Sequence, residues 1–182
     1  ALAAATPAPG GGSAAGLAGA MGAALVEMVA GLSLDKPRAN GGEQSALQRA
    51  ALERAHGARV DLLSLAEDDA AAYTAFMEAL RLPKGTDDER SARTTAISHA
   101  AQRAAEVPLA TLRATVAVAD AARSILDASL PAAASDLEVA LRFARAAGES
   151  AAENVEANLP YIEDAQDRKS TRLNSSHTDI SR

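Results

Sequence analysis

The stretch LLSLAEDDAAAYTAFMEAL, residues 62–80, decides the fold prediction because its apolar side chains recur with the period of an α-helix. At about 100° per residue, these side chains fall on one stripe along the helix surface. The stripe consists of Leu62, Leu65, Ala66, Tyr73, Phe76, Met77 and Leu80. The pattern therefore predicts an amphipathic helix whose apolar stripe packs against other elements of the protein.

One acidic residue, Asp69, lies within this apolar stripe, whereas its neighbours Glu67 and Asp68 turn away from it. Burying a carboxylate costs free energy unless a partner stabilises it, so such groups persist where they do chemistry or hold a network together. Two interpretations follow from the pattern alone. Asp69 is either a functional carboxylate or a structural one that caps a helix or hydrogen-bonds to another helix.

Composition predicts a single all-α domain. Aromatic residues make up 2% of the 182 residues and tryptophan is absent, while alanine is abundant. Strands favour the aromatic and β-branched side chains that are scarce here. The absence of cysteine excludes disulfides, thiolate catalysis and Cys-ligated metals. The three histidines have no metal-ligand spacing, so we expect no metal site. The formal net charge of −6 argues against a nucleic-acid surface.

Proline and glycine divide the chain into five expected helices, which short connections would arrange as an antiparallel bundle. Ser13 is the expected N-cap of the first helix, and Thr86–Glu89 and Ser135–Glu138 have the spacing of capping boxes. Pro108 is expected either to kink a helix or to begin a new one. The expected helices are residues 13–34, 45–82, 86–107, 108–129 and 135–159.

The first expected helix is apolar enough to resemble a membrane span, because residues 14–34 carry only one charge, Glu27. Alanine and glycine dominate this segment, and such a composition inserts weakly into a bilayer. Gly16, Gly19 and Gly22 indicate close helix–helix contact inside a soluble bundle. No basic region precedes the segment as in a signal peptide. We therefore expect a cytoplasmic protein that does not bind a membrane.

Both ends of the sequence look altered. The chain starts at Ala1 without methionine, which suggests a truncated N-terminal helix. After Arg168 the composition changes abruptly, because KSTRLNSSHTDISR contains no alanine and is rich in serine. We interpret residues 169–182 as a non-native tail and residues 1–168 as the single domain.

Two further features suggest a binding site. Three glycines in the loop PAPGGGS, residues 7–13, permit close backbone approach to a ligand, and the helix that follows offers free N–H groups. Asn154 and Asn158 lie on or beside the apolar face of the last helix, where asparagine needs a partner. The partner is either a ligand or another helix. Ser135 and Asp136 are explained equally well as ligand-binding residues or as the cap and a first-turn acid of their helix.

The motifs taken together resemble the formimidoyltetrahydrofolate cyclodeaminase / methenyltetrahydrofolate cyclohydrolase family. They occur in one order along nearly all of residues 5–165: PAPGGGS at 7–13, EDDAAAY at 67–73, RLPKGT at 81–86, EVPL at 106–109, SDLEVA at 135–140 and NVEANL at 154–159. The resemblance implies an all-helical homodimer that acts on a tetrahydrofolate derivative without a tightly bound cofactor. It also implies a final helix, which the serine-rich tail replaces here.

In this resemblance, Asp69 matches the catalytic aspartate. The family usually has Asp-x-Asp, whereas this chain has Glu67 at the first acidic position, so the role of that acid is open. The expected substrate-binding residues are Pro9, Gly10, Gly11, Gly12, Ser13, Lys36, Lys84, Ser135, Asp136, Asn154 and Asn158. The leading functional prediction is formimidoyltetrahydrofolate cyclodeaminase. The alternatives are methenyltetrahydrofolate cyclohydrolase and a non-catalytic helical interaction protein.

Overall fold

A computed structural model describes residues 1–35, 41–162 and 164–176. Within these ranges the chain forms five α-helices and two short 3-10 helices, with no strand, which confirms the all-α prediction. The α-helices are α1 (Gly11–Leu34), α2 (Gly41–Leu80), α3 (Asp87–Ser124), α4 (Ala134–Asn158) and α5 (Ala165–Ser176). The 3-10 helices are η1 (Pro131–Ala133) and η2 (Leu159–Tyr161).

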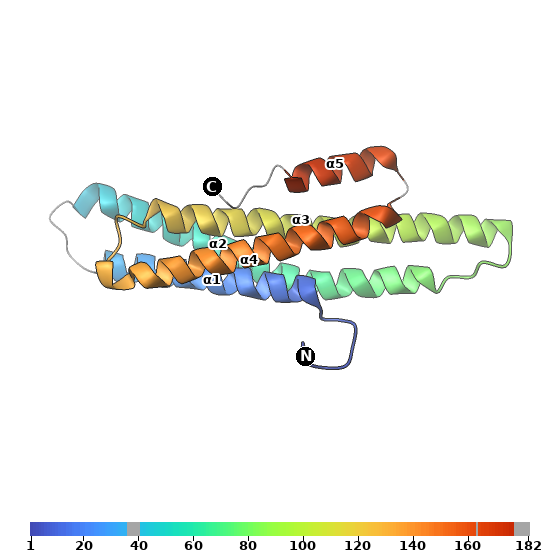
Figure 1. Cartoon of the computed structure of the whole chain (residues 1–182), viewed down its shortest axis with the longest axis horizontal. Coiled ribbons are helices and arrows are strands. Elements are labelled where there is room, and N and C mark those ends of the chain that lie inside the picture. The colour runs from blue at the N-terminus through green and yellow to red at the C-terminus, as the bar shows by residue number, and fades with distance from the viewer. Residues whose placement is uncertain (36–40, 163, 177–182) are drawn as a thin grey trace.

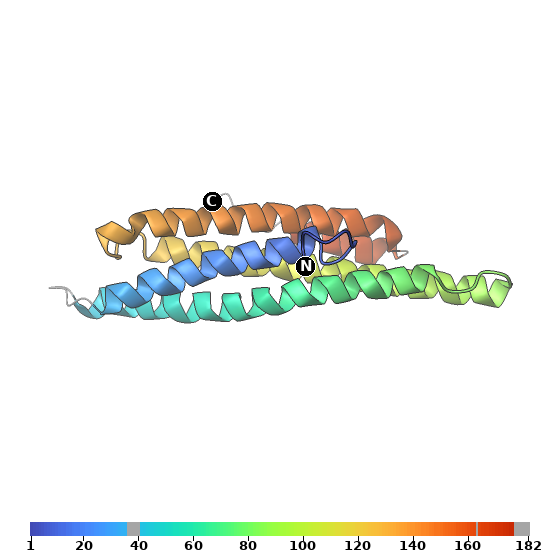
Figure 2. The same ribbon diagram turned by 90° about the horizontal axis from the view of Figure 1, so that it is seen from below.

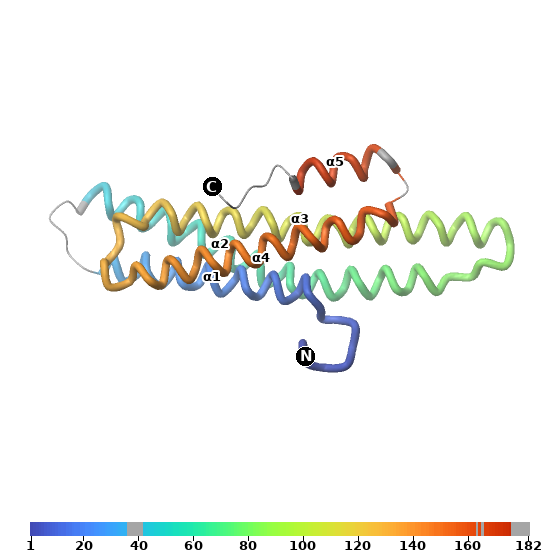
Figure 3. The backbone as a smooth tube through the Cα atoms, in the orientation of Figure 1, coloured from blue at the N-terminus to red at the C-terminus, as the bar shows by residue number. Residues whose placement is uncertain are grey.

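Helices α1 to α4 lie side by side in an elongated bundle, and α5 folds back along its outside (Figures 1 and 3). The helices differ in length: α2 and α3 have 40 and 38 residues, whereas α1 and α4 have 24 and 25. As a result, α1 begins partway along the bundle, and α2, α3 and α4 continue beyond its first turn (Figure 2). Among the described residues, no helix extends α1 along this part of α2, α3 and α4, although α5 lies against the outside of α3 and α4.

The core is built from small side chains that allow close helix packing. A Cβ added at Gly16 would lie 2.9 Å from the Leu62 carbonyl oxygen, and one at Gly22 would lie 3.0 Å from the Ala140 carbonyl oxygen. Helix α1 thus approaches the backbones of α2 and α4 directly, which confirms the role expected for these glycines. Among the described residues, α1 alone is long and apolar enough to cross a membrane, and 44% of its most apolar window is buried.

Several predicted helix ends need correction. Ser13 is not the N-cap of α1, because the helix begins at Gly11 after the cap residue Gly10. The Ser135–Glu138 capping box is wrong as well, since α4 begins at Ala134 directly after η1 and has no side-chain cap. The Thr86–Glu89 capping box is confirmed, with Glu89 N donating to Thr86 Oγ1 at 3.2 Å and Thr86 N donating to Glu89 Oε2 at 3.0 Å.

Pro108 does not divide the third helix. It lies inside α3, which continues from Asp87 to Ser124. Proline removes one backbone hydrogen bond from a helix, but packing on both sides of the break can hold the helix together. Here Pro108 is itself buried between the buried Val107 and Leu109. The two helices expected at residues 86–107 and 108–129 are therefore one helix, and the fifth α-helix of the described residues is α5, on the outside of the bundle.

Helix α5 includes residues that the sequence predicted as a non-native tail. Arg168 Nη1 donates to the Ile162 carbonyl oxygen at 2.6 Å, and Arg172 Nη2 donates to Glu156 at 3.2 Å. Ser175 is buried, but Leu173 is exposed, so the helix buries little apolar surface. Residues 169–182 are predicted not to contribute to stability. Of these, residues 177–182 lie outside the described ranges.

We expect a chain that ends at Arg168 to keep its free energy of unfolding within about 0.5 kcal/mol of the longer chain. The deletion removes an exposed ion pair and little buried surface, and exposed pairs contribute little. Urea denaturation followed by circular dichroism measures this difference. A large loss of stability would show that α5 is an integral part of the bundle.

Candidate active site

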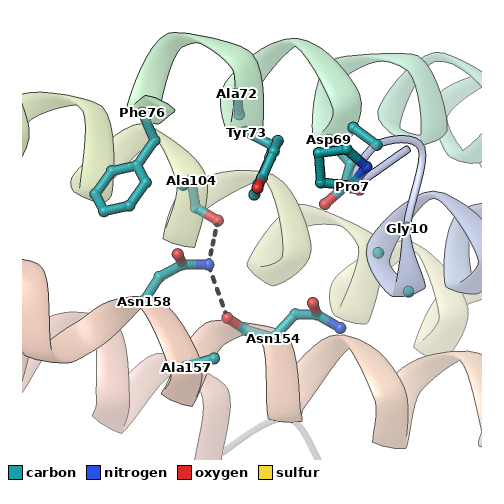
Figure 4. A pocket seen from close by; sticks show the side chains of 13 residues that line it. Pro7, Gly10, Asp69, Ala72, Tyr73, Phe76, Ala104, Asn154, Ala157 and Asn158 are labelled. Carbon is teal, nitrogen blue, oxygen red and sulfur yellow. Dashed lines mark hydrogen bonds between the residues drawn. The ribbon is translucent and has the colours of Figure 1, made fainter. Parts of the chain in front are cut away.

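A pocket of about 260 Å³ lies where α1 begins, beside α2, α3 and α4 (Figure 4). The loop before α1 closes one side of it. The lining residues come from this loop and from helices α1 to α4. They are Pro7, Ala8, Gly10, Gly11, Gly12, Asp69, Ala72, Tyr73, Phe76, Ala104, Asn154, Ala157 and Asn158.

Asp69 projects from α2 into this pocket, at the first turn of α1 (Figure 4). Its Oδ2 accepts a hydrogen bond from Ser13 Oγ at 3.0 Å. The carboxylate is partly buried rather than fully buried as the apolar stripe predicted, because the pocket opens in front of it. This position is compatible with both a structural and a functional interpretation of Asp69. One of its oxygens bonds to another helix, and the side chain also faces a cavity.

Gly12 leaves the space that the Asp69 carboxylate occupies. A Cβ built on Gly12 would lie 2.5 Å from Asp69 Cγ and 2.8 Å from Oδ2, and it would overlap Oδ1. Side chains do not approach this closely, so only glycine at this position allows the observed carboxylate position. The first turn of a helix also carries partial positive charge, which favours a nearby anion. Gly12 and Ser13 thus hold Asp69 in place from α1.

Two asparagines of α4 face Asp69 and Tyr73 across the pocket (Figure 4). Asn154 Nδ2 donates to the Ser150 carbonyl oxygen at 2.7 Å. Asn158 Nδ2 donates to the carbonyl oxygens of Ala104 at 3.0 Å and Asn154 at 2.9 Å. Within the described part of the chain, neither amide oxygen accepts a hydrogen bond. Asn158 therefore makes the interhelical bond that the sequence allowed and still offers an acceptor.

Two aromatic side chains, which the sequence pattern assigned only to the core, form one wall of the pocket. Tyr73 and Phe76 are both partly buried and lie on the same face of α2 as Asp69. Phe76 makes an edge-to-face contact with Tyr161, with ring centroids 5.1 Å apart and an interplanar angle of 67°. The sequence pattern already placed positions 69, 73 and 76 on one face of this helix, but it did not show that a pocket lies in front of that face. Pro7 and Ala8 of the loop carried no comparable signal.

The structure brings some predicted site residues together and separates others. Gly10, Gly11, Gly12, Asn154 and Asn158 line the pocket with Asp69. Pro9 does not line it, and Ser13 is only 2% exposed behind the Asp69 carboxylate.

The remaining predicted substrate contacts lie far from this pocket or outside the described residues. Lys84 is exposed in the turn between α2 and α3 at one end of the bundle, and Ser135 and Asp136 lie in the first turn of α4 at the other (Figure 1). Lys36 is outside the described residues. A single chain therefore does not place Lys84, Ser135 and Asp136 around the pocket, and the role of these three residues and of Lys36 stays a prediction.

The described residues contain no group of three or more histidine, aspartate or glutamate side chains that could hold a metal ion. Glu67, at the first acidic position of the motif, is exposed and outside the pocket. Asp68 lines a separate groove between α2 and α3. Among the described residues that line the pocket, Asp69 supplies the one carboxylate.

Comparisons with known proteins find similar sequences over most of the chain. The formiminotransferase-cyclodeaminase family model matches residues 1–177. The chain is 40% identical over 163 residues to the methenyltetrahydrofolate cyclohydrolase of Methylorubrum extorquens, covering 90% of this chain and 77% of that one. It is 32% identical over 164 residues to the formimidoyltransferase-cyclodeaminase of Gallus gallus, covering 90% of this chain but only 30% of that protein.

A solved structure is similar over almost the whole chain. The formiminotetrahydrofolate cyclodeaminase of Thermotoga maritima superimposes with a TM-score of 0.84 at 26% sequence identity. The match covers 97% of this chain and 83% of that one.

Proposed function

This chain belongs to the formiminotransferase-cyclodeaminase family, and on that premise we propose that it is a folate enzyme that uses Asp69 for acid–base chemistry on a one-carbon unit. The observation that carries the proposal is the Asp69 carboxylate, held by Ser13 at the edge of a pocket. The leading reaction is that of a formimidoyltetrahydrofolate cyclodeaminase, which forms 5,10-methenyltetrahydrofolate and ammonia.

The pocket suits the reduced pterin end of a folate. Tyr73 and Phe76 offer a flat apolar wall, and the free amide oxygens of Asn154 and Asn158 can accept hydrogen bonds from the N–H groups of the ring. The volume of about 260 Å³ is below the range of roughly 300–1,000 Å³ typical of whole-ligand pockets. The pocket therefore fits the ring that carries the one-carbon unit, with the rest of the folate outside it.

In the cyclodeaminase reaction, the nitrogen of the formimidoyl group is protonated. N10 attacks the carbon of this group and closes a five-membered ring. The proton on N10 must then reach the amino nitrogen, so that the bond from this nitrogen to the carbon breaks and ammonia leaves. The Asp69 carboxylate can accept that proton and return it to the leaving nitrogen. Its negative charge also stabilises the delocalised methenyl cation that remains.

The second candidate is methenyltetrahydrofolate cyclohydrolase, which the 40% identity to the Methylorubrum extorquens enzyme favours. Here water adds to the methenyl carbon, and Asp69 takes a proton from that water as general base. Asp69 then donates this proton to N5 as the bond from the carbon to N5 breaks, the hydroxyl proton is lost to solvent, and a formyl group remains on N10. One carboxylate next to the same carbon can serve either reaction.

An assay on both substrates tests the proposal. With 5-formimidoyltetrahydrofolate, a cyclodeaminase forms the absorbing methenyl cation together with an equal amount of ammonia. With 5,10-methenyltetrahydrofolate, a cyclohydrolase removes that absorbance without releasing ammonia. A protein that does neither, and whose melting temperature does not respond to tetrahydrofolate, would instead be the non-catalytic interaction protein. We expect neither reaction to need an added cofactor or metal.

We also propose an antiparallel bundle that forms a cytoplasmic homodimer and binds neither nucleic acid nor membrane. Successive positions of α1 face successively earlier residues of α2, an order that supports the antiparallel arrangement: Gly12 faces Asp69, Gly16 faces Ala66, and Glu27 bonds to Arg59. For the dimer, the support is an apolar face of α1 formed by Leu17, Met21, Met28 and Leu32.

This α1 face is suited to contact with a second copy. Its side chains recur at helical spacing and stay 39–51% exposed. The single charge of α1, on Glu27, is paired with Arg59 at 2.5 Å. An uncharged apolar stripe of this kind is typical of the core of a homodimer interface.

We expect the wild-type protein to sediment with twice the 18.5 kDa mass of one chain. The double variant Met21→Lys/Met28→Lys should sediment as a monomer, because two like charges would then face each other across the two-fold axis. Leu82→Lys, at an equally exposed leucine outside α1, is the control and should stay dimeric. A wild-type monomer, or a dimer that both lysines leave intact, would refute this interface.

A further inference from the structure

We propose that Pro108 is a positioning residue for substrate binding, which acts through the Ala104 carbonyl to orient the Asn158 side chain in the pocket. The inference rests on the proposed function, because it assigns a purpose to the Asn158 amide oxygen as a ligand acceptor. Nothing in the chain's periodicity explains a proline in the middle of α3, and the pocket geometry supplies a reason.

The first step concerns the backbone of α3. In an α-helix, the N–H of residue 108 would donate to the carbonyl oxygen of residue 104. Proline has no N–H, and its ring also crowds that carbonyl. Pro108 therefore leaves the Ala104 carbonyl without its usual helical donor. A partly buried carbonyl in this condition is stabilised by a donor from elsewhere in the fold.

Asn158 supplies that donor from α4. Its Nδ2 lies 3.0 Å from the Ala104 carbonyl oxygen and 2.9 Å from the Asn154 carbonyl oxygen (Figure 4). An amide nitrogen has two hydrogens, so these two bonds use both of them. The side chain is then fixed between α3 and α4, and its oxygen is left facing the pocket without a hydrogen bond from the described residues.

The same geometry connects two sequence motifs, whose residues Pro108 and Asn158 are 50 positions apart. EVPL at residues 106–109 contains the proline, and NVEANL at residues 154–159 contains the asparagine. Each motif is incomplete alone, since the proline frees a carbonyl and the asparagine needs one. Ala104 joins them, and it lines the pocket itself. Proline at position 108 thus removes one helical hydrogen bond, and the freed carbonyl orients the Asn158 amide at the site.

The test restores the missing N–H. Pro108→Ala should raise KM, and the dissociation constant for tetrahydrofolate, about fivefold or more, which corresponds to the loss of one oriented hydrogen bond. The turnover number should stay within about twofold, because Asp69 does not move. The melting temperature should stay the same or rise, because alanine is far more favourable than proline inside a helix. Pro108→Ser restores the same N–H with a different side chain and should give the same result.

A double-mutant cycle shows whether the effect passes through Asn158. Asn158→Ala alone should raise KM, and Pro108→Ala added to it should raise KM no further. Gly57→Ala is the control, because it places a better helix former in α2 where no atom lies within 4 Å. This variant should raise the melting temperature and leave KM unchanged, which separates helix stability from positioning.

Hydrogen exchange provides a readout that does not depend on activity. The side-chain amide protons of Asn158 should exchange slowly in the wild-type protein and faster in Pro108→Ala. Unchanged exchange and unchanged KM in both proline variants would overturn the inference, as would an equal rise in KM with and without Asn158. If the wild-type protein neither turns over folates nor binds tetrahydrofolate, the proposed function fails instead, and the exchange data still decide the structural step.

Discussion

Asp69→Asn is expected to lower turnover by about 10²-fold or more on whichever folate the wild-type protein converts. Asparagine has nearly the same volume and can still accept the hydrogen bond from Ser13 Oγ, so the side chain should keep its place. The amide cannot take up and return a proton, and it has no negative charge to stabilise the methenyl cation. The loss should therefore fall on kcat, with a small change in KM.

Asp68→Asn is the matched control. It removes the same charge from the neighbouring residue, whose side chain lines the groove between α2 and α3 rather than the pocket. Turnover should stay close to wild type, and both variants should melt cooperatively within a few degrees of it. Near wild-type turnover in Asp69→Asn on both folates would remove Asp69 from the mechanism. Equal losses in both variants would point to net charge instead of proton transfer.

The position of Asp69 on the inner face of α2 could be predicted from the sequence, because helical periodicity carries that information. The stripe from Leu62 to Leu80 fixed which way each side chain of α2 points, and an acid on an apolar face is rare enough to stand out. The same periodicity placed Tyr73 and Phe76 beside Asp69, although both were assigned to the core. A pocket wall and a core differ in whether a neighbouring helix covers the face, and one helix alone does not reveal that.

Other parts of the site depend on contacts that no local pattern encodes. Ser13 has the side chain of an N-cap, but α1 begins two residues earlier, and the hydroxyl bonds to Asp69 of another helix instead. The partner of Asn158 is the backbone carbonyl of Ala104. Every residue has such a carbonyl, so the residue type at position 104 could not identify it as this partner. Pro108 was expected either to kink a helix or to begin a new one. Packing of Val107 and Leu109 on both sides kept α3 continuous.

Gly12→Ala is expected to reduce turnover by about 10²-fold, because a reacting group displaced by about 1 Å loses activity on that scale. The added methyl group would overlap the Asp69 carboxylate, and the carboxylate would have to leave its position beside Ser13. The side chain of Asp69 can rotate away, so the fold should survive. Because alanine is the better helix former, the melting temperature should stay the same or rise slightly.

Gly31→Ala is the control for this variant. Gly31 lies in the same helix, and no atom lies within 4 Å of a Cβ added there. It should gain similar helix stability and keep full turnover. A Gly12→Ala protein that is stable, fully active and still holds Asp69 against Ser13 in a crystal structure would show that the first turn of α1 can shift. Since Gly16 fixes α1 against the Leu62 carbonyl oxygen only one turn later, we expect the carboxylate to move and the helix to stay.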